Sequence, residues 1–153
     1  MRIHAARAGE RGALLALWER SVRASHHFLA EEDIAFYRPL VGEFLDSGID
    51  LWVARNGASG GMAGFMGLDA QCLPVKLEAL FIDAGLLRRG FGALLVRHAL
   101  SLYRDIGLDV NEQNPGARAF YLRMGFRETG RSALDGAGKP FPLIHMRFGA
   151  TLP

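Results

Sequence analysis

A basic, glycine-flanked segment in the middle of the chain is the first place where residue types and spacing suggest chemistry. Leu80-Phe81-Ile82 has the composition of a strand, and Arg88-Arg89-Gly90-Phe91-Gly92-Ala93 leads from it into a helical pattern. The first turn of a helix leaves backbone N–H groups unpaired and carries the positive end of the helix dipole. Glycines let a phosphate approach those groups, and Arg88 and Arg89 can add charge-assisted contacts. The segment therefore predicts a site for an anion such as a diphosphate.

Other nucleotide-binding patterns fit this segment less well. A lone G-x-G before a helix is weak evidence, because an ordinary loop-to-helix turn has the same composition. The dinucleotide fingerprint requires a third glycine, but Leu95 stands at that position, and its tight turn would have to follow Ile82 directly. A P-loop requires Gly-Lys-Ser/Thr, which the chain lacks.

A second informative segment runs from Asn114 to Phe126 and reads NPGARAFYLRMGF. Asn114 is a typical helix N-cap, Pro115 fits the first helical position, and Gly125 fits the position just after a helix. Tyr121 lies in this helix and either carries chemistry or belongs to an apolar stripe at helical spacing. The other members of that stripe are Ala117, Phe120 and Met124.

Together the two segments resemble the GCN5-related N-acetyltransferase (GNAT) family. The family's motif A is Q/R-x-x-G-x-G/A; Gly90 and Gly92 match its glycines, and Leu87 departs from it by replacing the Gln or Arg. Asn114–Phe126 matches a second family pattern, N-x-x-A-x-x-F-Y-x-x-x-G-F. Two motifs in the right order are much more specific than either alone. Further similarity to a bacterial member of the family covers Trp18–Leu29, Val110–Asn114 and Gly138–Leu143.

The resemblance implies acetyl-CoA as the cosubstrate and a primary amine as the acceptor, either a small molecule or a protein lysine. It implies cofactor contacts for Leu80, Phe81, Ile82, Arg88, Arg89, Gly90, Phe91, Gly92, Ala93 and Asn114. The first three would pair with the pantetheine arm and hold the thioester carbonyl, and 88–93 would form the pyrophosphate loop. Tyr121 would protonate the leaving thiolate, with direct acetyl transfer in a ternary complex.

The acceptor must also lose a proton, because a free lysine with a pKa of about 10.4 is uncharged in only about one molecule in 2,500 at pH 7. The general base is expected to be Glu78, on the strand that enters motif A, or Asp109, five positions before Asn114. Either carboxylate could instead be a solvated strand residue.

Histidines add further candidates around the acceptor. His26 lies on the link between the first two helical segments, which borders the acceptor cleft in this family, and is expected to contact substrate or act as a base. A surface or capping role fits it equally well. His145, on the last strand, could reach the same cleft, whereas His4 and His98 are predicted to be structural. No metal site is expected, because the single cysteine, Cys72, and the scattered histidines lack ligand spacing. Cys72 is predicted to be a small apolar filler.

Hydrophobic periodicity and turn residues predict the elements that must position these side chains. Helices are expected at 10–24, 31–45 with a break near Pro39, 90–103 and 114–125, and strands at 2–6, 51–55, 61–68, 77–82, 108–111, 126–131 and 143–148. The second and third strands are predicted to form a hairpin around Asn56-Gly57. This order predicts a single α+β domain over 1–153, with a mixed sheet of about seven strands and about four helices on its faces. The resemblance implies that this is the GNAT fold, in which the sheet is mostly antiparallel and splits between strands 4 and 5.

The composition of the chain argues against nucleic-acid binding and against a membrane-spanning or secreted protein. The formal charge of +2, from 18 basic and 16 acidic residues, is too balanced to indicate nucleic-acid binding. No apolar run is long enough to span a membrane, and the N-terminal segment lacks the apolar core of a signal peptide, so a cytoplasmic protein is expected. A homodimer is left open. The alternative function, from a different class, is a non-catalytic sensor that binds acyl-CoA without turning it over.

Overall fold

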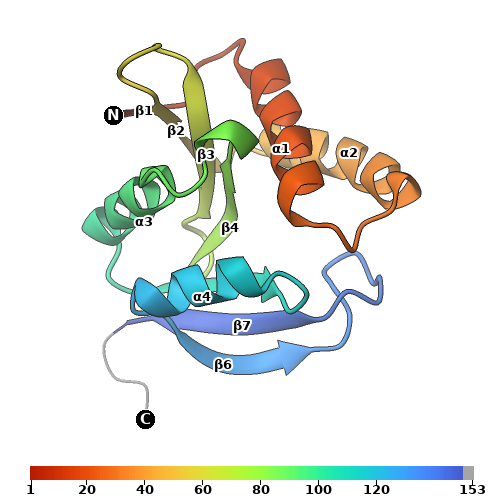
Figure 1. Cartoon of the computed structure of the whole chain (residues 1–153). Coiled ribbons are helices and arrows are strands. Elements are labelled where there is room, and N and C mark those ends of the chain that lie inside the picture. Colours follow the sequence, from red (N-terminus) through yellow and green to blue (C-terminus); the bar gives the residue numbers. More distant parts are fainter. Residues whose placement is uncertain (150–153) are drawn as a thin grey trace.

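The computed structural model describes residues 1–149 as a seven-stranded sheet with helices on both faces (Figure 1). The strands are β1 (Arg2–Ala5), β2 (Asp50–Arg55), β3 (Met62–Asp69), β4 (Val75–Ile82), β5 (Ile106–Asn111), β6 (Arg127–Ser132) and β7 (Leu143–Phe148). The helices are α1 (Arg11–Ser25), α2 (Glu31–Leu45), the single 3₁₀ turn η1 (Ala84–Leu86), α3 (Phe91–Leu102) and α4 (Pro115–Arg123).

The strand order is β1-β2-β3-β4-β5-β7-β6, and only the β4–β5 pair is parallel. Figure 1 shows α1 and α2 on the opposite side of β3 and β4 from α3, with α4 lying along β7. Two hydrophobic clusters follow from this layering: one lies between the sheet and α3 and α4, and the other between the sheet and α1 and α2. The predicted α+β fold, with its parallel pair between the fourth and fifth strands, is confirmed.

The β4 strand changes the face to which its side chains point halfway along its length. Val75 and Leu77 pack in the cluster under α3, and regular alternation would place Ala79 there too. The β3–β4 register shifts at this point, however, which leaves Glu78 as an extra residue in a β-bulge. Ala79 therefore packs under α1 and α2, and the next residue, Leu80, faces α3.

The parallel pairing of β4 with β5 is short. Only Val75–Leu77 pairs with β5, opposite Ile106–Leu108, and no pairing continues beyond Leu77 and Leu108. The following residues of β4, Leu80–Ile82, pair with β3 on one side and with no strand on the other. Backbone N–H and C=O groups on that side are thus left for another partner.

The expected break of the second helix near Pro39 is wrong. α2 runs unbroken from Glu31 to Leu45 with Pro39 inside it, because packing of its buried face, including Ile34 and Leu45, outweighs the loss of one backbone donor. The predicted hairpin of β2 and β3 is confirmed by their antiparallel pairing. In its loop, Gly60 N–H donates to Asn56 O at 2.7 Å, and Gly60 carries a positive φ of 73°. Within the described part of the chain, no helix has the length and apolar character that a membrane span requires.

Candidate active site

The N-terminus of α3 forms an exposed loop with unpaired backbone donors. Gly90 caps the helix in a left-handed conformation (φ 90°), and Arg88 also has a positive φ of 63°. The first intrahelical bond runs from Leu94 N–H to Gly90 O at 3.0 Å, so the N–H groups of residues 91–93 have no helical acceptor. Arg88 and Arg89 are exposed and form no ion pair with any residue in 1–149. These features fit the diphosphate of coenzyme A.

The second glycine of this loop, Gly92, lies against α4 and the end of β4. A Cβ atom on Gly92 would lie 3.4 Å from the ring of Phe120 and 3.8 Å from Ile82, both ordinary contact distances. Atoms beyond Cβ would press on these two side chains, so a branched residue at position 92 should shift the start of α3 and its unpaired N–H groups.

An ion pair holds the entrance to this loop against α1. Arg20 donates to both oxygens of Asp83, at 3.1 Å from Nε and 2.8 Å from Nη2. The hydrogen bonds from Arg20 lower the pKa of Asp83, so the carboxylate stays ionised at neutral pH. Asp83 directly follows β4, and its carbonyl accepts from Leu86 N–H at 2.8 Å.

The helix α4 presents a buried phenol. Asn114 caps it by accepting from Ala117 N–H at 3.2 Å, and Gly125 follows it with φ 102°, as the sequence predicts. Tyr121 is 8% exposed and packs edge-on against the rings of Phe120 and Phe126. Burial raises the pKa of Tyr121, so the phenol keeps its proton at neutral pH.

The two predicted base residues come together around a lysine that sequence reasoning did not single out. Lys76 Nζ lies 3.0 Å from Asp109 Oδ2 and 3.7 Å from Glu78 Oε1. The other Asp109 oxygen lies 2.5 Å from His145 Nδ1, and His145 Nε2 lies 2.6 Å from Ser132 Oγ. These residues form a polar row from the point where β4 and β5 part, across β7, to β6. We call the five residues the Lys76 cluster.

Strand registers explain why these side chains meet. Asp109 is the first β5 residue beyond the last β4–β5 pair, and its direct partner on β7 is His145. Lys76 pairs with Gly107 and alternates with Val75 and Leu77, which are buried under α3. Lys76 and Asp109 consequently face away from α3.

The electrostatics of the cluster fix its protonation at neutral pH. Burial raises the pKa of Asp109, but the hydrogen bonds from His145 and Lys76 outweigh burial, and the net pKa lies below the ordinary value. Burial lowers the pKa of Lys76, but its hydrogen bond to Asp109 and the nearby carboxylates raise the net value. Asp109 is therefore a carboxylate and Lys76 an ammonium. An ionised Asp109 accepts the Nδ1–H of His145, and the other ring nitrogen, Nε2, lies within hydrogen-bond distance of the Ser132 hydroxyl.

His26 lies at the end of α1, next to the β6–β7 loop. Its Nδ1 is 2.8 Å from Ser25 Oγ and its ring packs on Phe28, which in turn contacts Phe141. Burial, together with the charge of His27, lowers the pKa of His26 to about 4. A neutral imidazole at the meeting of these two loops, which Figure 1 shows side by side, suits contact with substrate better than proton uptake near neutral pH.

Cys72 is not the apolar filler that the sequence suggests. It is half-buried, and its thiol donates to Asp69 Oδ2 at 3.4 Å, which raises the pKa of the thiol. Ligand atoms of Asp69, Cys72 and Glu78 lie within 4.8 Å of one another. The Lys76 ammonium beside Glu78 opposes a cation there.

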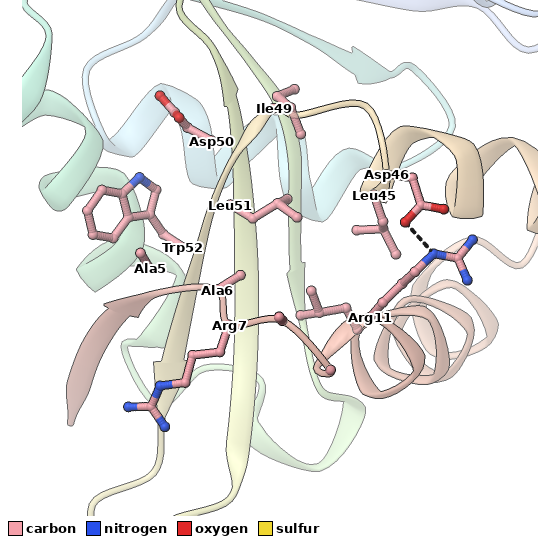
Figure 2. A pocket seen from close by; sticks show the side chains of 13 residues that line it. Ala5, Ala6, Arg7, Arg11, Leu45, Asp46, Ile49, Asp50, Leu51 and Trp52 are labelled. Atoms are coloured by element: carbon pink, nitrogen blue, oxygen red, sulfur yellow. Dashed lines mark ion pairs between the residues drawn. The ribbon is translucent and has the colours of Figure 1, made fainter.

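Two hollows mark the surface of the described residues. One, of about 370 Å³, is lined by Lys76, Asp109 and His145 together with Leu73 and Thr129. The other, of about 500 Å³, lies between the β1–α1 link, the end of α2 and the start of β2 (Figure 2). Its lining carries the Arg11–Asp46 ion pair at 2.7 Å and none of the residues predicted for the site.

Sequence reasoning predicted the α3 loop, the α4 tyrosine and the two carboxylates as separate features. The structure joins Glu78 and Asp109 through Lys76 and adds Ser132 beyond His145. The contacts of His26 are with Ser25 and Phe28 instead of with this cluster. The two-residue spacing of Lys76 and Glu78 on a strand was the only signal in the sequence that could have suggested Lys76.

Comparison with known proteins supports the assignment of the fold and the family. A family model described as an acetyltransferase (GNAT) domain matches residues 47–128. The peptidyl-lysine N-acetyltransferase YjaB of Salmonella typhimurium is 42% identical over 144 residues, 94% of this chain and 95% of that protein. YjaB of Escherichia coli is 42% identical over 146 residues, 95% of each chain.

Solved structures agree. The solution structure of apo YjaB from Escherichia coli superposes with a TM-score of 0.79 at 40% identity, covering 97% of this chain and 98% of that one. The PaiA N-acetyltransferase of Thermoplasma acidophilum in complex with coenzyme A gives a TM-score of 0.76 at 18% identity, covering 98% and 100%. The resemblance to YjaB and the expected cosubstrate are thereby confirmed. The chain belongs to the GNAT family, and it is an N-acetyltransferase that uses acetyl-CoA.

Proposed function

We propose that the protein is a peptidyl-lysine N-acetyltransferase that transfers the acetyl group directly from acetyl-CoA to a lysine side chain in a ternary complex. The observation that carries the choice of acceptor is the Lys76 cluster, in which two carboxylates already hold a lysine ammonium where β4 and β5 part. The names of the two YjaB relatives support the same acceptor class.

In this proposal acetyl-CoA lies along the unpaired side of β4. The N–H groups opening α3 bind its diphosphate, with Arg88 and Arg89 alongside. Leu80–Ile82 would pair with the pantetheine arm and direct a backbone N–H at the thioester carbonyl, where negative charge develops. Asn114, which has its Oδ1 engaged in capping α4, would offer its amide nitrogen to the cofactor arm.

The acceptor lysine would approach from the opposite face, where Glu78 and Asp109 lie. Removing a proton from a lysine ammonium at pH 7 costs about 4.6 kcal/mol, and the nitrogen can attack only after this proton is lost. A carboxylate positioned to take the proton offsets part of this cost. Glu78 and Asp109 would share that role, with His145 holding Asp109 in place.

Tyr121 would supply the second proton transfer. The attacking nitrogen forms a C–N bond, the C–S bond breaks, and the thiolate takes the phenolic proton. The second nitrogen proton restores Tyr121, so that one proton ends on coenzyme A and one reaches solvent. The raised pKa of Tyr121, which keeps its hydroxyl protonated at neutral pH, supports this role.

The test measures coenzyme A release from acetyl-CoA with a lysine peptide, comparing wild type, Tyr121→Phe and the matched control Tyr103→Phe. Tyr103 closes the other end of α3 and lies outside the proposed site. We expect Tyr121→Phe to lower kcat by about 100-fold or more with an unchanged Kd for acetyl-CoA, and Tyr103→Phe to match wild type. An unchanged kcat in Tyr121→Phe would rule out the acid role. Binding of acetyl-CoA without release for any amine would favour the sensor alternative.

A further inference from the structure

Lysine is scarce in this chain, and one of its two lysines lies at the proposed acceptor position. Lys76 and Lys139 are the only lysines in 153 residues, against 16 arginines. The Lys76 side chain is 35% exposed, borders the 370 Å³ hollow, and places its ammonium between the two candidate base carboxylates.

We propose that Lys76 is an acetylation site of the enzyme itself: without a peptide, the protein transfers the acetyl group from bound acetyl-CoA to its own Lys76. This inference rests on the acetyl transfer proposed above. It assigns Lys76 the position that the ammonium of a substrate lysine takes during turnover, and a peptide lysine must displace it.

The strand register places Lys76 within reach of the transferred group. Lys76 pairs with Gly107, one residue before the last β4–β5 pair, and its Nζ extends beyond that pair to Glu78 and Asp109. Just past these residues, Leu80–Ile82 leaves the backbone side unpaired where the thioester is proposed to lie. The lysine, the two bases and the thioester site thus converge where the two strands part.

The other lysine offers an internal comparison. Lys139 Nζ is 3.1 Å from Asp33 on α2 and 4.3 Å from the centre of the Phe36 ring. Its side chain is 29% exposed, close to the 35% of Lys76, and it also pairs with a carboxylate. The two lysines are therefore alike in exposure and in having a carboxylate partner. They differ in position, because only Lys76 lies where the pairing of β4 with β5 ends.

The transfer balances with groups that the site already holds. The Lys76 ammonium gives one proton to Glu78 or Asp109, and the freed nitrogen attacks the thioester carbonyl. The C–N bond forms as the C–S bond breaks; the thiolate takes a proton from Tyr121, and the second nitrogen proton replaces it. The products are acetyl-Lys76, free coenzyme A and one proton released to solvent.

The experiment incubates wild-type protein with acetyl-CoA and no peptide, and follows each lysine by peptide mass spectrometry over time. We expect Lys76 to gain one acetyl group at least about ten times faster than Lys139. The rate constant should not change on dilution of the protein, because the transfer is intramolecular. Tyr121→Phe should slow the acetylation of Lys76 and leave that of Lys139 unaltered. Lys76→Arg should abolish acetylation at position 76.

Three results would overturn the inference: no acetyl group on Lys76, equal rates at both lysines, or a Lys76 rate that Tyr121→Phe does not change. The last two would indicate plain chemical acetylation by the thioester. A parallel assay with a lysine peptide separates this failure from that of the proposed function. If the peptide is acetylated while Lys76 stays unmodified, only the self-acetylation is refuted. If coenzyme A is released neither with the peptide nor without it, both the self-acetylation and the proposed function are refuted.

Discussion

Replacing Lys76 with glutamine removes one of the two groups, His145 being the other, that lower the pKa of Asp109, and the size of the effect can be worked from one distance. Two unit charges 3.0 Å apart, as Lys76 Nζ and Asp109 Oδ2 are, interact by about 1.4 kcal/mol with the screening of water and about 5.5 kcal/mol at an effective dielectric constant of about 20. The two side chains are 35% and 24% exposed, which favours the lower figure. We therefore expect Lys76→Gln to tighten proton binding by the carboxylate by about tenfold or more.

The sign of the effect on activity follows from the base role. A general base works only when unprotonated, so activity is lost as pH falls through its pKa. The ammonium of Lys76 lowers the pKa of Asp109, and its removal raises that pKa and moves the loss of activity to higher pH. The contact of His145 Nδ1 with Asp109 Oδ1 does not involve Lys76, and it should remain in the variant.

The assay is the pH profile of kcat/KM with a lysine peptide and saturating acetyl-CoA. Lys76→Gln should shift the acidic limb to higher pH. Lys139→Gln, which removes an equal charge from within the β6–β7 loop, where Lys139 pairs with Asp33 on α2, should leave the limb in place. KM for the peptide should also fall in Lys76→Gln, because the peptide no longer competes with an internal ammonium. If the acidic limb of Lys76→Gln coincides with that of wild type while acetyl-CoA still binds, Asp109 is not the base.

Three further predictions follow. Gly92→Val should weaken acetyl-CoA binding by about tenfold or more in calorimetry. The control is Gly12→Val, at the equivalent second position of α1, where an added Cβ would meet no atom within 4 Å and binding should not change. Equal affinities of the two variants would place the diphosphate elsewhere. Asn114→Ala should lower the free energy of unfolding by about 1 kcal/mol in a denaturant titration through loss of the α4 cap, and an unchanged midpoint would refute the cap. Phe65→Ala should destabilise by about 3 to 5 kcal/mol because Phe65 is fully buried under α1 and α2, and Leu73→Ala, at a side chain 93% exposed, should have no measurable effect.

Local signals in the sequence were enough to place the start of α3, with the loop before it, and the α4 helix. Gly90, Asn114 and Gly125 act through their own backbone conformation or a contact three residues away, so their roles are readable from neighbouring residues. The element order was readable for the same reason. Pro39 shows the limit of such signals, since tertiary packing keeps α2 continuous through it.

The Lys76 cluster could not be predicted in this way. It depends on β7 lying between β5 and β6, which sets His145 beside Asp109 and brings Ser132 to His145. It also depends on the end of the β4–β5 pairing at Leu77 and Leu108, which brings Asp109 to the ammonium of Lys76. Both features arise from contacts between residues far apart in the chain.

The bulge at Glu78 has a consequence for the balance between stability and activity. Because Glu78 is the extra residue, a chain lacking it would keep every other β4 side chain on its present face, and the core would remain filled. A straight β4 could then continue its ladder with β5 past Leu77, and the added hydrogen bonds would make the sheet sturdier. Those bonds would use the backbone groups proposed to receive the cosubstrate. We therefore expect a protein of that kind to be more stable and to lose binding of acetyl-CoA.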